Sequence, residues 1–194
     1  MTARPPVLQG RHVRLEPLEE SHLESLWAAQ DPTVWAYMPT RIGTRMELAA
    51  WVRDRRAGLA SGTAIPFAQL DARSGAVVGS TSLFDIDRAR GSAEIGHTWI
   101  SRPHRRTALN TESKLLLLGH AFDAMRLTRV QLKCDERNAA SRRAIERIGG
   151  VYEGTLRWTM PLADGTMRNT AVYSVIAPEW SAVKARLAGF LARN

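Results

Sequence analysis

The residues best suited to chemistry lie between Arg105 and Gly150. An arginine-rich loop containing Arg105 and Arg106 precedes a leucine-rich stretch, Thr111–Met125, whose apolar residues recur at helical spacing. The free N–H groups and the positive dipole end at a helix N-terminus attract anions. The loop and helix therefore predict a phosphate site, and a pyrophosphate would suit it.

A second helix, predicted over Ala139–Ile148, follows a strand at Arg129–Lys133. Asn138 stands before this helix and Gly149 after it, and these residue types commonly cap the two ends of a helix. The order loop, helix, strand and helix places an anion site beside a slot within one short stretch of chain. We interpret the stretch as a site that holds a phosphorylated carrier and carries out chemistry at its far end.

The elements that position this site follow from hydrophobic periodicity. Two predicted helices lie between a first strand and a meander of three strands. The second helix begins with the capping-box spacing of Thr44 and Glu47. A strand–helix–strand unit inside antiparallel hairpins predicts an α/β mixed sheet, which we expect to form one domain over residues 1–194. We expect a terminal helix at Glu179–Ala192. The expected strands are Val13–Pro17, Ile65–Leu70, Ala76–Phe84, Ala93–Ile100, Arg129–Lys133, Tyr152–Met160 and Thr170–Ile176.

The composition restricts the classes of partner. The 27 basic and 19 acidic residues give a net charge of +8, which favours anionic partners unless the arginines are simply solvated. The single cysteine, Cys134, excludes an internal disulfide and favours a reducing compartment. We expect a cytoplasmic protein with no membrane segment and no signal peptide. The five histidines show no ligand spacing, so we expect no metal, and no motif supports nucleic-acid binding.

Two motifs carry a resemblance to a known family. The run IGHTWISRPHRRTALNTE, Ile95–Glu112, resembles the acetyl-CoA signature of the GNAT N-acetyltransferases, and NAASRRAIERIG, Asn138–Gly149, resembles the family's N-x-x-S…G segment. The opening GRHVRLEPL, the closing hairpin and the EW-led helix resemble the branch that acetylates the N-terminal alanine or serine of ribosomal proteins. The resemblance implies a mostly antiparallel sheet with a splayed parallel pair and helices on both faces.

The resemblance also implies the reaction and the residues that hold its co-substrate. Acetyl-CoA would donate its acetyl group directly to a primary amine in a ternary complex. Backbone N–H groups near Trp99 and Ile100 would polarise the thioester carbonyl, while the pantetheine arm lies between the splayed strands. The residues implied in binding acetyl-CoA are Trp99, Ile100, Arg105, Arg106, Thr107, Ala108, Leu109, Asn110, Thr111, Asn138 and Ser141.

The chain departs from the family pattern at three positions. Ala108 and Asn110 replace the two glycines of the usual phosphate loop, so we expect a loop of altered shape and a loss of affinity. Asn110 is also a residue type that can cap the following helix. Ile145 stands where many members have a tyrosine that protonates the leaving thiolate. Ser141 could replace that tyrosine, or could be an ordinary residue of the first helical turn. Asn138, likewise, could hold the pantetheine arm, cap the helix, or do both.

The remaining site residues have competing interpretations. Glu94 is the candidate general base, acting directly or through water, unless it is a solvated strand residue. Strand alternation predicts that His97 lies on the opposite strand face from Glu94. Trp35 and Tyr37 lie in an irregular stretch where the resemblance implies the wall of the acceptor site, although packing under the helix pair would explain them equally well.

Several functions stay open on sequence grounds. The acceptor could be a protein or peptide N-terminus or a small amine. A non-catalytic, regulatory acyl-CoA-binding module is the alternative from another class, favoured by the changes at Ala108, Asn110 and Ile145. The hairpin segment Val151–Trp158 and the C-terminal helix could support a homodimer.

Overall fold

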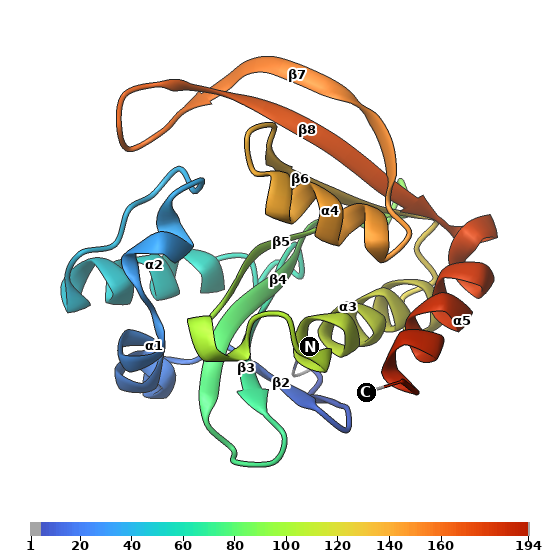
Figure 1. Cartoon of the computed structure of the whole chain (residues 1–194), viewed down its shortest axis with the longest axis horizontal. Helices are drawn as coiled ribbons and strands as arrows, with labels where there is room; N and C mark the ends of the chain where they lie inside the picture. Colours follow the sequence, from blue (N-terminus) through green and yellow to red (C-terminus); the bar gives the residue numbers. More distant parts are fainter. Residues whose placement is uncertain (1–4, 194) are drawn as a thin grey trace.

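The computed structural model describes residues 5–193 and contains five α-helices packed on one sheet (Figure 1). The strands are β1 (Leu8–Gln9), β2 (Val13–Pro17), β3 (Ile65–Asp71), β4 (Val77–Asp87), β5 (Ser92–Ile100), β6 (Arg129–Asp135), β7 (Val151–Pro161) and β8 (Met167–Ile176). The helices are α1 (Leu23–Ala29), α2 (Arg45–Arg56), α3 (Ala108–Gly119), α4 (Ala139–Arg147) and α5 (Trp180–Leu191). Short helical turns are η1 (Glu20–His22), η2 (Pro32–Trp35), η3 (Arg102–His104), η4 (His120–Ala124) and η5 (Ala177–Glu179).

The sheet order is β1-β2-β3-β4-β5-β6-β8-β7. Among the described strands only β5 and β6 pair in parallel, and all other neighbours are antiparallel. The parallel pairing runs from Ser92 opposite Arg129 to Ile95 opposite Leu132, so the ladder stops halfway along β5. The predicted mixed sheet with one splayed parallel pair is confirmed.

Helices cover both faces of the sheet (Figure 1). The larger core lies against α3, α4 and α5 and includes the fully buried Leu117, Leu118 and Leu187. The smaller core lies against α1 and α2 and is built around Leu26 and Trp35. Burying each such side chain contributes about 1.5–3 kcal/mol, so both faces of the sheet are held by apolar packing.

Capping residues fix where the helices begin. Thr44 and Glu47 form the predicted capping box of α2. Helix α3 begins at Ala108, earlier than predicted, because Thr107 rather than Asn110 is its N-cap and its hydroxyl accepts a hydrogen bond from Leu109 N–H at 3.3 Å. Asn110 therefore does not cap this helix. Across residues 5–193, no helix combines the length and the apolar character that crossing a bilayer requires.

Candidate functional site

A β-bulge in β5 opens the gap between the two parallel strands. Ser80 pairs with Trp99 and Ser82 with Gly96, so Thr81 alone faces two residues of β5. One of these is His97, which adopts a positive φ of 50°. A bulge bends its strand, and this one comes directly after the last β5–β6 pair. The two parallel strands therefore separate beyond Ile95, as the resemblance implied.

A buried lysine braces this bulge. The Nζ of Lys114, on α3, donates to the hydroxyl of Thr98 at 2.8 Å and to that of Thr81 at 3.4 Å, and the two hydroxyls lie 2.8 Å apart. Lys114 is only 6% exposed, and burial lowers its pKa to about 7. The group joins the two strands where the backbone ladder is interrupted. Sequence reasoning missed it, and the available signal was one lysine beside a run of four leucines.

Replacing Lys114 with Met should make the protein more stable at pH 6.5. In the unfolded state the pKa of Lys114 is about 10.4, whereas in the folded state it is about 7. Below pH 7, each pKa unit between the two states lowers the free energy of unfolding by about 1.4 kcal/mol. The gain from Lys114→Met should therefore be largest below pH 7 and shrink as pH rises towards 10. Urea unfolding at pH 6.5, 8 and 9.5 measures it. A gain that does not change with pH would contradict this explanation.

A backbone N–H faces the gap beyond the bulge. Ser101 N–H donates to Val78 O at 2.7 Å, and Trp99 O accepts from the Gln69 side chain at 3.2 Å, so both groups point towards β4. Alternation along the strand then turns the N–H of Ile100 towards the open side. Gly79 allows this close approach of β4, because a Cβ there would lie 2.1 Å from Trp99 O. The backbone thus presents a hydrogen-bond donor inside the gap.

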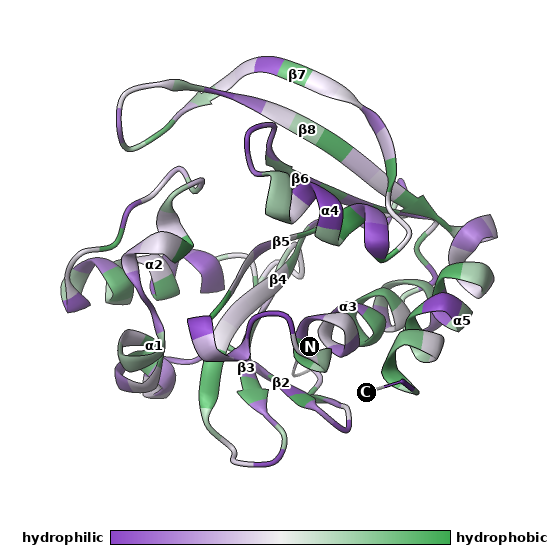
Figure 2. Cartoon of the chain, in the orientation of Figure 1, coloured by the Kyte–Doolittle hydropathy of each residue, from purple (hydrophilic) through white to green (hydrophobic). Residues whose placement is uncertain are grey.

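The loop after β5 forms an anion-binding end. It is hydrophilic (Figure 2) and leads into the first turn of α3, whose N–H groups have no partner within the helix, although the Thr107 hydroxyl already accepts from Leu109 N–H. Arg106 takes a positive φ of 64°, whereas Ala108 and Asn110 lie within the helix and take no such φ. Neither residue therefore needs the backbone freedom of the glycine that it replaces. The dipole and the N–H groups suit a phosphate here.

Arg105 ties this loop to the rest of the fold. Its Nε donates to Ile100 O at 3.0 Å, and its guanidinium pairs with Asp31 at 3.2 Å and bonds the hydroxyl of Thr33 at 3.3 Å. Thr33 and Asp31 begin η2, which precedes the helix α2. Arg105 thus fixes the end of β5 against η2, and its contact with a phosphate stays a prediction.

The start of α4 lies at the other side of the gap. Asn138 Oδ1 accepts from Ser141 N–H at 3.0 Å, so the predicted cap is confirmed. The Asn138 amide nitrogen donates no hydrogen bond to a described residue and stays available. Burial raises the pKa of the Cys134 thiol, and the nearby Ser141 hydroxyl opposes this shift. Ile145 is 7% exposed and packs in the larger core, so it offers no proton donor.

Glu94 and His97 share one face of the sheet, contrary to the prediction from strand alternation. Glu94 pairs with Phe84 across the ladder, and the ring of Phe84 lies 4.3 Å from that of His97. The bulge is the reason, since it adds one residue and reverses the alternation. Glu94 is 7% exposed, and its carboxylate accepts from Lys133 at 2.8 Å and from Gln131 at 3.2 Å.

The expected acceptor wall separates into a buried and an exposed part. Trp35 is 2% exposed and packs against Trp51 and Trp99 at 5.7 and 5.8 Å, so it supports the wall from inside and does not line it. This burial supports the packing interpretation of Trp35, and a contact with the acceptor stays a prediction. Tyr37 is 38% exposed and lies close enough to Arg137 to raise the pKa of that guanidinium.

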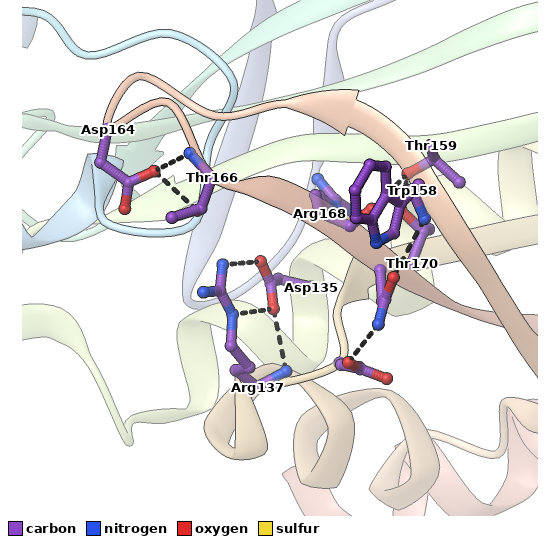
Figure 3. Close-up of polar contacts among 10 residues, drawn as sticks. Asp135, Arg137, Trp158, Thr159, Asp164, Thr166, Arg168 and Thr170 are labelled. Carbon is purple, nitrogen blue, oxygen red and sulfur yellow. Dashed lines mark hydrogen bonds and ion pairs between the residues drawn. The ribbon is translucent and has the colours of Figure 1, made fainter.

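Arg137, in the loop between β6 and α4, is held by a carboxylate at the end of β6. Asp135 is the main cause of the raised pKa of Arg137, and it accepts two bonds from its guanidinium at 2.9 and 2.7 Å (Figure 3). Asp164, in the turn between β7 and β8, contributes less to the same shift. Charges from two other loops therefore act on Arg137. Within residues 5–193 no cluster of three His, Cys, Asp or Glu side chains could hold a metal ion.

The family follows from this fold and from comparison with known proteins. Residues 12–151 match the family model described as the acetyltransferase (GNAT) domain. The chain belongs to the GNAT acetyltransferase family. The predicted family is thereby confirmed, together with its fold.

Individual relatives show how far the likeness extends. The chain is 31% identical over 110 residues to the "Putative ribosomal N-acetyltransferase YdaF" of Bacillus subtilis, an alignment that covers 57% of this chain and 59% of YdaF, less than two thirds of that protein. A GCN5-related N-acetyltransferase from Brucella melitensis is 31% identical with a TM-score of 0.90, covering 98% of this chain and 87% of its own. RimJ of Mycobacterium smegmatis, in complex with CoA-disulfide, shares the fold at 21% identity and a TM-score of 0.81, with 95% and 94% covered.

Proposed function

We propose that the protein transfers the acetyl group of acetyl-CoA to a primary amine, and that this amine is the N-terminus of a protein or peptide. The observation that carries the proposal is the gap beyond Ile95, which holds a free backbone N–H and ends at the N-terminus of α3. An extended, polar arm with a pyrophosphate at one end and a thioester at the other fits these features. Membership of the GNAT family and the likeness to YdaF support the same function.

The binding half of the site would act through backbone groups. The first turn of α3 would hold the pyrophosphate, with Arg106 and Thr107 beside it. The exposed edge of β5 would pair with the pantetheine arm, and the free amide nitrogen of Asn138 would donate to the same arm. Ile100 N–H would polarise the thioester carbonyl and stabilise the oxyanion that forms when the amine attacks.

The proton transfers would fall to two side chains. The Ser141 hydroxyl, placed beside Cys134 at the start of α4, would donate a hydrogen bond to the departing thiolate. Glu94 would accept the proton of the attacking amine through water, because Lys133 and Gln131 hold its carboxylate on the sheet face that α2 covers. Tyr37 would contact the acceptor from the exposed wall.

Ser141→Ala and Glu94→Gln should separate these two roles. Each change should lower kcat about 10- to 1,000-fold, since one positioned acid or base contributes roughly 100- to 10,000-fold. Binding of acetyl-CoA should stay within about threefold of wild type for Glu94→Gln. Thiol release, followed with a peptide and with acetyl-CoA at saturation, gives kcat. Unchanged kcat for both variants would remove the two residues from the mechanism.

The acceptor is tested by a panel assay. Defined N-terminal peptides should be acetylated, whereas a polyamine and an aminoglycoside should react at least tenfold more slowly. Preference for the small amines would favour the second candidate function, acetylation of a small-molecule amine. Binding of acetyl-CoA without acetylation of any acceptor would favour a regulatory module.

We also propose that the protein forms a homodimer through β7. The edge strand β7 exposes Val151, Tyr152, Leu156 and Trp158, which are 47–74% accessible, and a second copy could cover them. Sedimentation of wild type and of Trp158→Lys should then give a dimer and a monomer. We place the protein in the cytoplasm, where the free thiol of Cys134 stays reduced.

A further inference from the structure

Two cavities of about 170 and 110 Å³ lie between α2 and the sheet, next to the bulge. Arg55 of α2 and His97 of β5 line both of them, and Ser82 of β4 lines the larger one. His97 belongs to the bulge that opens the β5–β6 gap, so the cavities adjoin the proposed place of acetyl transfer. They lie on the sheet face that also carries Glu94.

Three side chains that line the larger cavity have a buried polar atom without a hydrogen-bond partner among residues 5–193. These atoms are Arg55 Nε, Ser82 Oγ and His97 Nδ1. Ser82 is 2% exposed, so its hydroxyl lies inside the fold. Buried polar atoms in folded proteins are nearly always hydrogen-bonded to protein, water or a ligand, so a polar group that enters this cavity could find three partners there.

The chemistry of these atoms shows which ligand atom fits. His97 Nε2 contacts the guanidinium of Arg55, which can only donate, so Nε2 must accept and the proton lies on Nδ1. Burial and the charge of Arg55 lower the pKa of His97 to about 3, so the imidazole is neutral. Arg55 Nε–H, His97 Nδ1–H and the Ser82 hydroxyl are then all donors. They suit an oxygen that accepts hydrogen bonds, and His97 cannot serve as the base.

The charge of the cavity selects among such oxygens. Arg55 contributes one positive charge, whereas Asp54 and Asp85 at the rim contribute two negative charges, so the lining is net negative. Asp54 pairs with Arg55, and its side chain is 64% exposed. A carboxylate would be repelled by this lining, while an uncharged amide carbonyl would not, and a cationic group could lie at the rim.

We propose that this cavity is a subsite for an amide carbonyl of the acceptor, bound by Arg55, Ser82 and His97 while a positively charged group of the acceptor faces Asp54 and Asp85. The subsite rests on the proposed function and gives it a substrate class, since peptides carry such carbonyls and simple polyamines do not. It also gives the bulge a second role. The positive φ of His97 turns its ring to the sheet face where the acceptor would bind.

Ser82→Ala tests the subsite in the enzyme. The KM for Ala-Ala-Lys amide should rise about tenfold, the effect of one lost hydrogen bond, with the affinity for acetyl-CoA unchanged. The melting temperature should stay the same or rise, because the hydroxyl has no partner to lose. Ser74→Ala is the control, since its hydroxyl donates to Asp71 in the turn between β3 and β4, and neither residue lines the cavity. An unchanged KM, or a clear loss of stability, would overturn the subsite while leaving acetyl transfer intact.

A binding experiment without turnover keeps the two proposals distinct. Titration of the wild-type protein with N-methylacetamide should shift the backbone NMR signals of Ser82, His97 and Arg55, and Ser82→Ala should weaken the response. Dimethylamine, which lacks the carbonyl, should give no such shifts. Absence of the amide-specific shifts in wild type would overturn the subsite whether or not peptides are acetylated. Their presence in a protein that acetylates no peptide would support the subsite and contradict the proposed acceptor.

Discussion

Glu112→Ala should lower the free energy of unfolding by about 3–5 kcal/mol, the largest loss of stability we expect from one side chain. Glu112 lies in the first turns of α3 and is 6% exposed. Its carboxylate accepts the backbone N–H groups of Arg11, His12 and Val13 at 2.9, 2.5 and 2.8 Å. Removing it leaves the N–H groups of the buried Val13 and the half-buried His12 unpaired, and each such loss costs about 1–3 kcal/mol, whereas the N–H of the exposed Arg11 can turn to water. Urea unfolding measures the change.

Glu112→Gln is the matched control. One amide oxygen can still accept from two of the three donors, so the loss should be about half as large. Gly10 supports the same arrangement, because a Cβ there would lie 2.3 Å from the carboxylate. A loss below about 1 kcal/mol for Glu112→Ala would mean that the contact between the turn before β2 and α3 contributes little. The Glu112 carboxylate would then not be what holds α3 against the start of β2.

The local elements could be predicted because their signals are local. Alternating apolar residues predict β2, and the capping residues Thr44 and Asn138 predict where α2 and α4 begin. The start of α3 was missed because Thr107 and Asn110 are both residue types that cap helices, and only the fold shows which of them has the N-cap dihedrals.

The parts of the site that sequence reasoning missed depend on distant contacts. The bulge at His97 interrupts a regular alternation, and nothing in the residue types around it signals the extra residue. Lys114 meets Thr98 from 16 positions away, and Glu112 meets Val13 from 99 positions away. Trp35 was assigned to the acceptor wall because its segment is irregular, although three tryptophans pack there into a buried cluster.

Thr107→Asp should weaken binding of acetyl-CoA at least a hundredfold without destabilising the fold. Aspartate is as good an N-cap as threonine, and its charge is favourable at the N-terminus of α3. The same charge would lie at the proposed pyrophosphate position, where like charges about 5 Å apart repel by roughly 3 kcal/mol at an effective dielectric constant near 20. Thr107→Asn keeps the cap and adds no charge, so its affinity should stay within about threefold of wild type.

Calorimetric titration of acetyl-CoA into wild type, Thr107→Asp and Thr107→Asn tests most directly whether the start of α3 and the β5–β6 gap hold acetyl-CoA. We expect wild type and the asparagine variant to bind, and the folded aspartate variant, checked by its melting temperature, to lose binding. Equal affinity of all three proteins, or no binding by wild type at millimolar acetyl-CoA, would contradict the account.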